Sequence, residues 1–344
     1  MAALIIQACG RDHGAGAPSD SAVPAVAGER HLANIRRLTS TGSNAEAYFS
    51  HDGQRLIFQS TRDGRACDQQ YTMRIDGSDL RRVSIGSGKT TCGYFIDADR
   101  RIIYASTHVA DTACPPRPDP SKGYVWGLDP YNIYVANPDG SDLRPLTHAD
   151  AYTAEVTLSP ADRKTLVFTS LKDGDLDIYT MWTDGSHVRR LTTTPGYDGG
   201  AFFSPDGRQI VYRAWHPVDT ALASYQALLR ERIVRPNRME IWVMNADGSG
   251  QRQITSLGGA NFAPYFTPDG RRIIFSSNYR NPRSRNFDLY VVNLDGSGLD
   301  QVTTDPEFDG FPMFSPDGAK LVWASSRGAG SVGGPDIYVA DWRQ

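Results

Sequence analysis

The sequence predicts an all-β protein, a six-bladed β-propeller, from three observations. One hairpin pattern recurs along the chain, a second hairpin pattern follows each copy, and the copies lie at similar distances; Asp269 and Asp317, for example, hold the same turn position 48 residues apart. Short strands that repeat at about this period are the sequence signature of propeller blades. We therefore expect four strands in each blade.

The first hairpin is clearest at residues 203–212, where Ser-Pro-Asp-Gly separates two apolar stretches. Pro presets the backbone of the turn, Asp caps it, and Gly adopts a left-handed conformation. A degenerate copy has Asp97, Ala98 and Asp99 in place of Pro-Asp-Gly. The full set of copies begins at residues 49, 95, 158, 203, 266 and 314, which gives six blades.

The second hairpin is typified by residues 177–192, with an Asp-Gly-Ser turn between two strands. In the last copy, residues 311–342, the fourth strand is missing, while residues 35–39 near the start of the chain repeat its sequence. We expect this N-terminal segment to complete the last blade as its outer strand and so to close the ring. Residues 31–344 then form one domain.

These alternating Ser-Pro-Asp-Gly-Arg and Asp-Ile-Tyr-x-Met-x-x-Asp-Gly-Ser segments resemble the propeller repeats of TolB and its relatives, over residues 31–344. The resemblance specifies the fold but leaves several functions open. Propellers of this kind occur in periplasmic adaptor proteins, in gating domains of serine peptidases, in polysaccharide lyases and as appendages of secreted hydrolases. TolB itself carries an α/β domain before its propeller, which residues 1–30 are too few to supply.

Residues 1–30 have a different composition from the rest of the chain. An apolar run at residues 2–6 leads to Cys9 and then to a stretch rich in Gly, Ala, Ser and Pro, although no Lys or Arg precedes the run. This arrangement resembles a bacterial lipoprotein signal, which implies lipidation of Cys9 and a location in the periplasm or cell envelope. The alternative is an ordinary disordered linker with an incidental cysteine. No segment is long enough to span a membrane, so only the lipid would provide an anchor.

Charge and cysteine content narrow the function classes. The formal net charge is −3 and Lys and Arg are scattered, which argues against nucleic-acid binding. Cys67, Cys92 and Cys114 permit one disulfide and one free thiol in an oxidising compartment. Cys67 could pair with Cys92 or with Cys114, and none of the three has the spacing of a zinc site.

Two long loops are expected on the face opposite the hairpin turns, where a rigid scaffold presents binding residues. They comprise residues 106–131 and 213–238. Within the second loop, apolar residues at spacings of three and four predict an amphipathic helix that ends before Pro236 and either packs on the blades or binds a partner. The candidate contact residues of the two loops are His108, Tyr124, Trp126, Trp215 and His216.

The start of each innermost strand is expected to ring the axial channel. The aligned positions are Glu46, Cys92, Glu155, Gly200, Ala263 and Phe311, with Asn44, Thr90, Thr153, Asp198, Asn261 and Asp309 two residues earlier. Carboxylates and amides that converge on one mouth suit a cation, a sugar or a peptide amine. The alternative is that they bond to loop amides. We expect Asn278, Tyr279, Arg280 and Arg283 at the same rim.

The main functional hypothesis is a monomeric, lipid-anchored scaffold that binds an envelope protein or polymer through the long-loop face. It has no catalytic residue and no predicted cofactor, apart from a divalent cation that the channel leaves open. The alternative is a metal-assisted lyase or hydrolase that uses His108, His216, Glu46, Glu155 or Asp198 as ligand or base. A third interpretation is an accessory domain for a separately encoded hydrolase.

Overall fold

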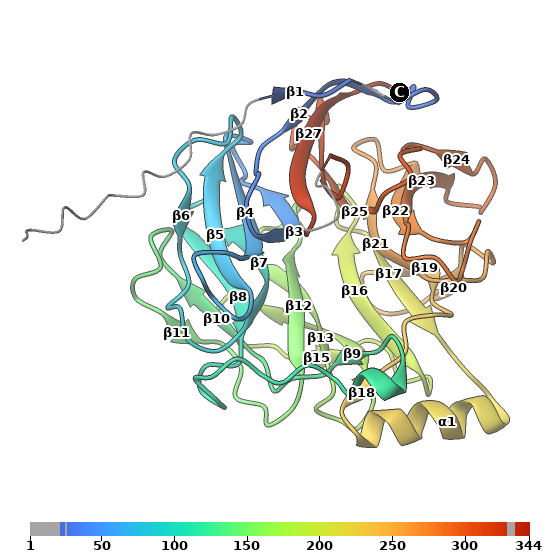
Figure 1. Ribbon diagram of the computed structural model, residues 1–344. Coiled ribbons are helices and arrows are strands. Elements are labelled where there is room, and N and C mark those ends of the chain that lie inside the picture. Colours follow the sequence, from blue (N-terminus) through green and yellow to red (C-terminus); the bar gives the residue numbers. More distant parts are fainter. Residues whose placement is uncertain (1–20, 25, 329–333) are drawn as a thin grey trace, which may run out of the picture.

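The computed structural model describes residues 21–24, 26–328 and 334–344, and it is a ring of six antiparallel sheets (Figure 1). Cys9, the expected lipidation site, lies outside the described residues. Each sheet has its first strand innermost, and the fourth strand is outermost in blades one to five. Blades one to three consist of β3 (Ser43–Phe49), β4 (Arg55–Thr61), β5 (Gln69–Arg74) and β6 (Arg81–Arg82); β7 (Thr90–Ile96), β8 (Arg101–Ser106), β10 (Asn132–Ala136) and β11 (Arg144–Pro145); β12 (Thr153–Leu158), β13 (Thr165–Ser170), β14 (Asp177–Trp182) and β15 (Arg189–Arg190).

Blades four to six follow the same order along the chain. They consist of β16 (Tyr197–Phe203), β17 (Gln209–Trp215), β19 (Glu240–Asn245) and β20 (Arg252–Gln253); β21 (Asn261–Phe266), β22 (Arg272–Ser277), β23 (Asp288–Asn293) and β24 (Asp300–Gln301); β25 (Asp309–Phe314), β26 (Lys320–Ser325), β27 (Asp336–Trp342) and β2 (Leu32–Arg37). The predicted all-β class and the six blades are therefore confirmed.

Blade six closes the ring with strands from both ends of the chain, as predicted. β2 pairs with β27 from Leu32 opposite Trp342 to Arg37 opposite Tyr338. β1 (Ser21–Ala22) adds a fifth strand outside β2, within the segment assigned to the linker. Glu29 of the same segment is buried and pairs with Arg327 at 2.9 Å. The joint between the termini thus rests on a buried ion pair as well as on backbone hydrogen bonds.

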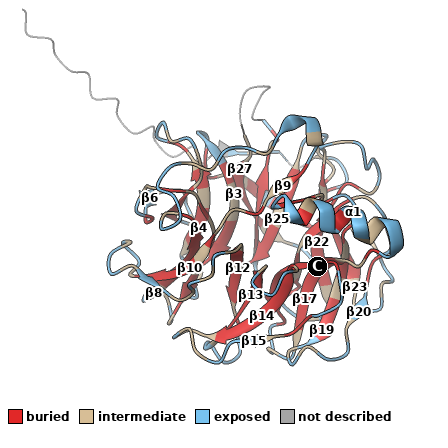
Figure 2. Cartoon of the chain, turned by 90° about the horizontal axis from the view of Figure 1, so that it is seen from below, coloured by how far each residue is buried: buried red, intermediate tan, exposed pale blue. Residues whose placement is uncertain are grey.

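The hydrophobic core lies between neighbouring blades. The second strand of each blade is buried on both faces, so its residues are apolar in succession rather than in alternation; Ile102, Ile103 and Tyr104 of β8 are all fully buried. Figure 2 shows this pattern from the side of the single helix, with buried strands surrounded by exposed loops.

All six innermost strands carry a β-bulge at the same position. The strand register shifts at this point in every blade, and the bulge residues all have a positive φ between 50° and 60°. A bulge inserts one extra residue, bends the strand and redirects a side chain. The six bulge residues are those predicted to line the channel, namely Glu46, Cys92, Glu155, Gly200, Ala263 and Phe311.

Two residues further along, large side chains fill the middle of the channel. Tyr48 lies 5.6 Å from Tyr94 and 5.7 Å from Phe202 between ring centroids, and Phe202 lies 5.1 Å from Tyr265. We call these four rings the aromatic belt. The belt separates a cavity of about 670 Å³ at the long-loop end from one of about 300 Å³ at the hairpin-turn end.

The predicted helix of the second long loop is α1 (Asp219–Arg230). Tyr225 and Leu229 are buried, and the Tyr225 hydroxyl donates to Asp175 at 2.6 Å and to the Gly196 carbonyl at 2.8 Å. Of the two alternatives, the structure therefore shows the helix packed on the blades, with its outer side exposed (Figure 2).

Candidate functional site

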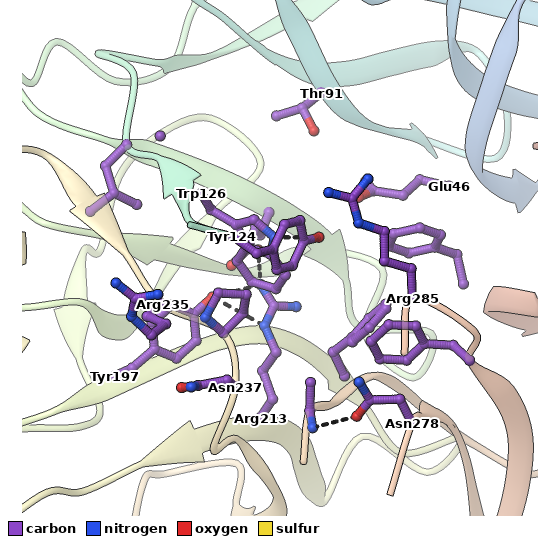
Figure 3. A pocket seen from close by; sticks show the side chains of 18 of the residues that line it. Glu46, Thr91, Tyr124, Trp126, Tyr197, Arg213, Arg235, Asn237, Asn278 and Arg285 are labelled. Atoms are coloured by element: carbon purple, nitrogen blue, oxygen red, sulfur yellow. Dashed lines mark hydrogen bonds and ion pairs between the residues drawn. The ribbon is translucent and has the colours of Figure 1, made fainter. Parts of the chain in front are cut away.

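The larger cavity opens on the long-loop face and receives residues from all six blades. Its wall includes part of both long loops, which a short two-stranded sheet joins: β9 (Trp126–Gly127) pairs with β18 (Ile233–Val234). The Arg235 guanidinium donates to the Lys122 carbonyl at 2.8 Å and adds a second link. This joint fixes Trp126 beside the cavity (Figure 3), and no sequence pattern predicted it.

The floor of the cavity contains an ion pair between Glu155 and Arg213. Glu155 also accepts hydrogen bonds from the Thr169 hydroxyl at 2.7 Å and the Gly200 amide at 2.8 Å, and Arg213 donates to the Tyr197 hydroxyl at 2.6 Å. A Cβ on Gly200 would come within 2.0 Å of Arg213. Blade four therefore lacks a side chain at its bulge because Arg213 occupies that space.

Glu46 is the second carboxyl of the floor and has fewer donors. Among the residues that the structure describes, its one hydrogen-bond donor is the Cys92 thiol at 2.9 Å. Burial raises the pKa of Glu46 to about 7, since one weak donor does not offset the lost hydration. Burial also raises the pKa of Cys92 well above its usual value. Glu46 is therefore the floor group that exchanges a proton near neutral pH, and Cys92 is a thiol.

The wall from blades five and six is apolar. Phe262 lies 4.8 Å from Phe287 and 5.5 Å from Phe311 between ring centroids, at interplanar angles of 61° and 52°. Trp126 approaches Phe262 edge-on at 6.2 Å. We call Phe262, Phe287, Phe308 and Phe311 the phenylalanine wall. Blades one to three contribute polar groups across the channel, so the two sides of the cavity differ in chemistry.

The rim is basic. Five basic residues line the cavity against three acidic ones. Lys89 pairs with Asp129 at 3.2 Å and Arg213 pairs with Glu155. Arg283 and Arg285 are exposed and make no hydrogen bond or ion pair with any residue that the structure describes. Figure 3 shows Arg213, Arg235 and Arg285 around the same space. The site therefore favours an anionic group at its mouth.

Four of the predicted site residues line this cavity: Glu46, Glu155, Tyr124 and Trp126. The Trp126 indole donates to the Tyr124 hydroxyl at 3.0 Å, which holds the two rings together. Asn278 and Arg283, both expected at the rim, line it as well, whereas Tyr279 and Arg280 do not. Arg280 lies nearby and donates to Tyr279 at 3.4 Å.

Asp198, Asn261 and Asp309 do not lie at the channel mouth, which corrects their predicted placement. All three side chains are fully buried inside the blades. Asp309 accepts from Trp323 at 2.9 Å and from Arg327 at 2.8 Å. Asn261 donates to the Met239 carbonyl at 2.9 Å. These residues bond to the scaffold rather than to the channel, although their partners are side chains and a backbone carbonyl and not the loop amides that the alternative expected.

The remaining predicted contact residues lie outside the cavity. His216 pairs with Asp198 at 3.0 Å; burial alone would lower the pKa of His216, but Asp198 raises it. Trp215 packs edge-on against Tyr225 of α1 at 6.0 Å. His108 hydrogen bonds with Ser106 at 2.8 Å, and burial lowers its pKa. The structure therefore does not bring the histidines together with Glu46 and Glu155.

No group of three or more His, Cys, Asp or Glu side chains that could hold a metal ion occurs within residues 21–24, 26–328 and 334–344. At the floor, Arg213, Thr169 and the Gly200 amide already occupy Glu155. No helix of the described chain is long and apolar enough to cross a membrane. Cys67, Cys92 and Cys114 are all free thiols.

The sequence pattern predicted Phe311 as a channel residue, but it did not indicate Arg213, Arg235, Arg285 or the other three rings of the phenylalanine wall. Arg213 could have been found, because it follows the Pro-Asp-Gly turn of blade four at a position where blade six has Ala324. Arg235 and Arg285 lie in loops without a repeat partner, so nothing in the pattern indicates where they point.

Comparisons with known proteins agree with this architecture. A family model described as the TolB beta propeller domain matches residues 233–344. A TolB homolog from Chlorobium luteolum is 28% identical over 230 residues, which cover 58% of this chain and 52% of the homolog. The chain spans between a quarter and about half of the length of the curated relatives it matches.

Solved structures share the fold at low sequence identity. A TolB-type protein from Agrobacterium tumefaciens has a TM-score of 0.58 at 18% identity, with 89% of this chain and 93% of that chain covered. An oligogalacturonate lyase in complex with manganese has a TM-score of 0.53 at 16% identity, with 92% and 94% covered. Together with the six closed blades, these matches identify the chain as a TolB-like six-bladed β-propeller.

Proposed function

We propose that this propeller is an extracytoplasmic binding module, which holds an envelope protein or polymer in its axial cavity without changing it chemically. The observation that carries the proposal is the open cavity of about 670 Å³ with aromatic walls, a basic rim and exposed arginines at its mouth. Concave sites with apolar walls and a few convergent polar groups are the usual form of a binding site. The match to a TolB propeller domain supports a scaffold or binding role.

The location and the mode of attachment are part of the same proposal. The resemblance of residues 1–9 to a lipoprotein signal supports lipidation at Cys9 and a place in the periplasm or cell envelope. The same binding surface is consistent with a monomer that acts alone and with one that serves a separately encoded hydrolase.

An enzyme is the second candidate, favoured by the ionisation of Glu46. A carboxyl with a pKa of about 7 that faces an open cavity has the proton affinity suited to a general acid or base at neutral pH. The lyase among the structural neighbours shows that propellers of this shape also carry out chemistry. In this account, the substrate is a sugar or peptide bound against the phenylalanine wall, and Glu46 moves its proton.

One experiment separates the two candidates. The purified protein is incubated with libraries of synthetic peptides, uronic-acid oligosaccharides and peptidoglycan fragments. Each ligand that the protein retains is eluted, and its mass is measured by mass spectrometry. The binding proposal predicts ligands that are retained by the native protein, lost with Trp126→Ala and recovered unchanged. Trp182→Ala, on the outer part of blade three, serves as the matched control. Retained ligands that are cleaved by the native protein but not by Glu46→Gln would replace the proposal with the enzyme, and the absence of any retention would overturn both.

A further inference from the structure

The basic rim and the apolar wall meet on one short segment of blade five. Arg283, Arg285 and Phe287 follow one another at alternate positions before β23, and all three line the cavity. Asn278 holds this segment in place: its carboxamide oxygen accepts from the Ala260 amide at 2.8 Å, and its nitrogen donates to the Ser284 carbonyl at 3.2 Å. Asn278 is itself buried. The segment is therefore positioned before any ligand arrives.

The distance between the two features is small. Arg285 and Phe287 are two residues apart, so their Cα atoms lie within about 7 Å of each other. A ligand that carries a negative charge close to an apolar group can therefore engage both features. The last residue of a peptide does so, because one Cα bears both the terminal carboxylate and the side chain.

The phenylalanine wall is shaped to surround a side chain. Its rings are tilted against one another at 52° to 66°, with centroids 4.8 to 6.2 Å apart, and thus form a concave surface rather than one flat face. A sugar ring or a nucleobase stacks on a flat face, whereas a concave group of rings encloses an aliphatic or aromatic side chain.

The charges agree with a carboxylate at the mouth. Arg283 and Arg285 have no acidic partner among the residues that the structure describes, so their charges are available to a ligand. A guanidinium binds a carboxylate through two parallel hydrogen bonds. Blade two faces blade five across the ring and offers the Thr91 hydroxyl oxygen, which donates its proton to Gln59 at 2.9 Å and can accept from a backbone amide of a bound peptide.

We propose that the axial cavity binds the free C-terminus of a peptide that ends in an apolar residue, with the carboxylate on Arg283 and Arg285 and the last side chain against the phenylalanine wall. This inference rests on the proposed binding function and names its ligand class. It assigns recognition to a peptide end rather than to an internal segment or a sugar.

The test uses a library of hexapeptides with a constant Gly-Gly-Gly-Ser start and two varied final residues, synthesised once as free acids and once as C-terminal amides. Binding to the full chain is measured by fluorescence polarisation. We expect free acids that end in Phe, Leu or Trp to bind, and the matching amides to bind ~10- to 100-fold more weakly, as for the loss of one charged hydrogen-bonded pair. Arg285→Glu is expected to weaken the free acids to a similar extent, and Arg280→Ala, on the same segment but outside the cavity, to leave binding unchanged.

A second variant tests the apolar half without removing a buried ring. Ala263→Phe places a phenyl group at the bulge of blade five; Phe311 already occupies the equivalent bulge of blade six with a φ of 57°, so the backbone accepts it. We expect this variant to fold, as judged by its melting temperature, and to shift the preference from terminal Phe towards terminal Ala.

Equal binding of acids and amides that Arg285→Glu does not alter would overturn the peptide-end inference and leave the binding function standing. Binding of uronic-acid oligosaccharides or peptidoglycan fragments, with no hexapeptide bound, would likewise overturn the peptide-end inference and leave the binding function standing. Failure of every library and peptide would overturn the binding function itself, so the two failures are distinguishable.

Discussion

The two mouths of the axial channel are built from the same repeat but differ in chemistry. At the hairpin-turn end, the smaller cavity is lined by the repeated turn residues, such as Pro160, Pro205, Pro268 and Pro316. At the long-loop end, the six bulges carry five different residue types: Glu, Cys, Glu, Gly, Ala and Phe in chain order. The repeated residues form turns and hold the blades together, whereas the bulge positions are free to vary. This variation supports placing the proposed binding site at the long-loop end of the channel.

The largest expected effect concerns the Glu155–Arg213 pair on the floor of the long-loop mouth. Arg213→Met leaves the Glu155 carboxylate without its counter-ion, and breaking a buried pair typically costs about 3–5 kcal/mol. We expect a loss of this size in the free energy of unfolding at pH 7, measured with urea. The double variant Arg213→Met with Glu155→Gln should recover much of the loss. A loss below about 1 kcal/mol in the single variant would mean that the pair belongs to the ligand site rather than to the scaffold.

The second largest effect on stability is expected from oxidation of two cysteines in the loops at the long-loop mouth. The Cys67 thiol hydrogen bonds with Cys114. The Cys67 thiol also lies 3.4 Å from the Gly88 carbonyl, and the Gly88 amide donates to the carbonyl of Thr112, near Cys114, at 2.7 Å. Glutathione disulfide should convert the two thiols to a disulfide and be reduced to glutathione. Closing a loop of this length stabilises a protein by about 2–4 kcal/mol.

Cys92→Ser should retain this gain in urea unfolding, and Cys114→Ser should lose it. Alkylation of Cys67 and Cys114 at every glutathione ratio would show that the pair does not form, and a disulfide that includes Cys92 would contradict the placement of its thiol on Glu46.

Replacing one glycine at each mouth by alanine allows the two mouths to be compared directly. Gly200, at the long-loop bulge, and Gly270, at a hairpin turn, have φ values of 60° and 68°. A Cβ on Gly270 meets only Pro205 at 3.7 Å, whereas on Gly200 it would collide with Arg213. Gly270→Ala should therefore cost about 1 kcal/mol, for the left-handed backbone alone.

Gly200→Ala should cost more, about 2–3 kcal/mol, and should weaken ligand binding, because Arg213 must move. Ala263 occupies the equivalent bulge with a φ of 50°, so the backbone does not forbid alanine there. Equal losses of stability for the two variants, by thermal unfolding, would show that Gly200 does not serve to admit Arg213.

The smallest expected effect is a difference between the two mouths in how their carboxyl groups make protein stability depend on pH. Burial raises the pKa of Glu46 to about 7; the groups that face it are Cys92, Glu155, Arg213 and Asp68. Between pH 4.5 and pH 7 the native state keeps a proton that the unfolded state has lost, so stability falls as the pH rises through this window. Glu46→Gln should remove this fall, with a gain of about 1–2 kcal/mol above pH 7, reduced from the full shift because the carboxyl lines an open cavity.

Asp317 at the hairpin-turn end should respond in the opposite sense. The hydrogen bond from Ser315 lowers the pKa of Asp317, so its stabilisation is present above its usual pKa and is lost as the pH falls below about 4. Asp317→Asn should therefore lower stability above about pH 4, and its difference from the native protein should shrink as the pH falls below that value. Unfolding curves for both variants across pH 3 to 8 check the two signs, and a parallel response would refute the contrast.

The repeat made most of the fold predictable, because each turn needs Pro, Asp and Gly at set positions and each strand needs its apolar residues. The closure by residues 35–39 followed from the same pattern. Glu46 and Glu155 were predictable as channel residues, since aligned positions meet at the axis. Asp198, Asn261 and Asp309 were misplaced because the extra residue of each bulge breaks the alternation of side chains, and a residue two positions earlier turns into the blade.

The rest of the site depends on contacts that no repeat encodes. The pairing of β9 with β18 joins segments about 100 residues apart, and neither has a counterpart in another blade. Arg285 and Phe287 are close in sequence, but Phe262, Phe308 and Phe311 come from other segments of blades five and six and join them only in the folded ring. Side chains in unique loops are positioned by packing alone, so their convergence appears only in three dimensions.

The most direct test of the central claim compares the two mouths in one binding experiment. The libraries of peptides, oligosaccharides and peptidoglycan fragments are probed with the native protein, with Trp126→Ala and Arg285→Glu at the long-loop mouth, and with His51→Ala and Arg163→Ala at the hairpin-turn mouth. The account predicts that the first pair of variants loses the retained ligands and that the second pair keeps them. Retention that survives both long-loop variants and disappears with His51→Ala or Arg163→Ala would contradict the account and place the binding site at the other end of the channel.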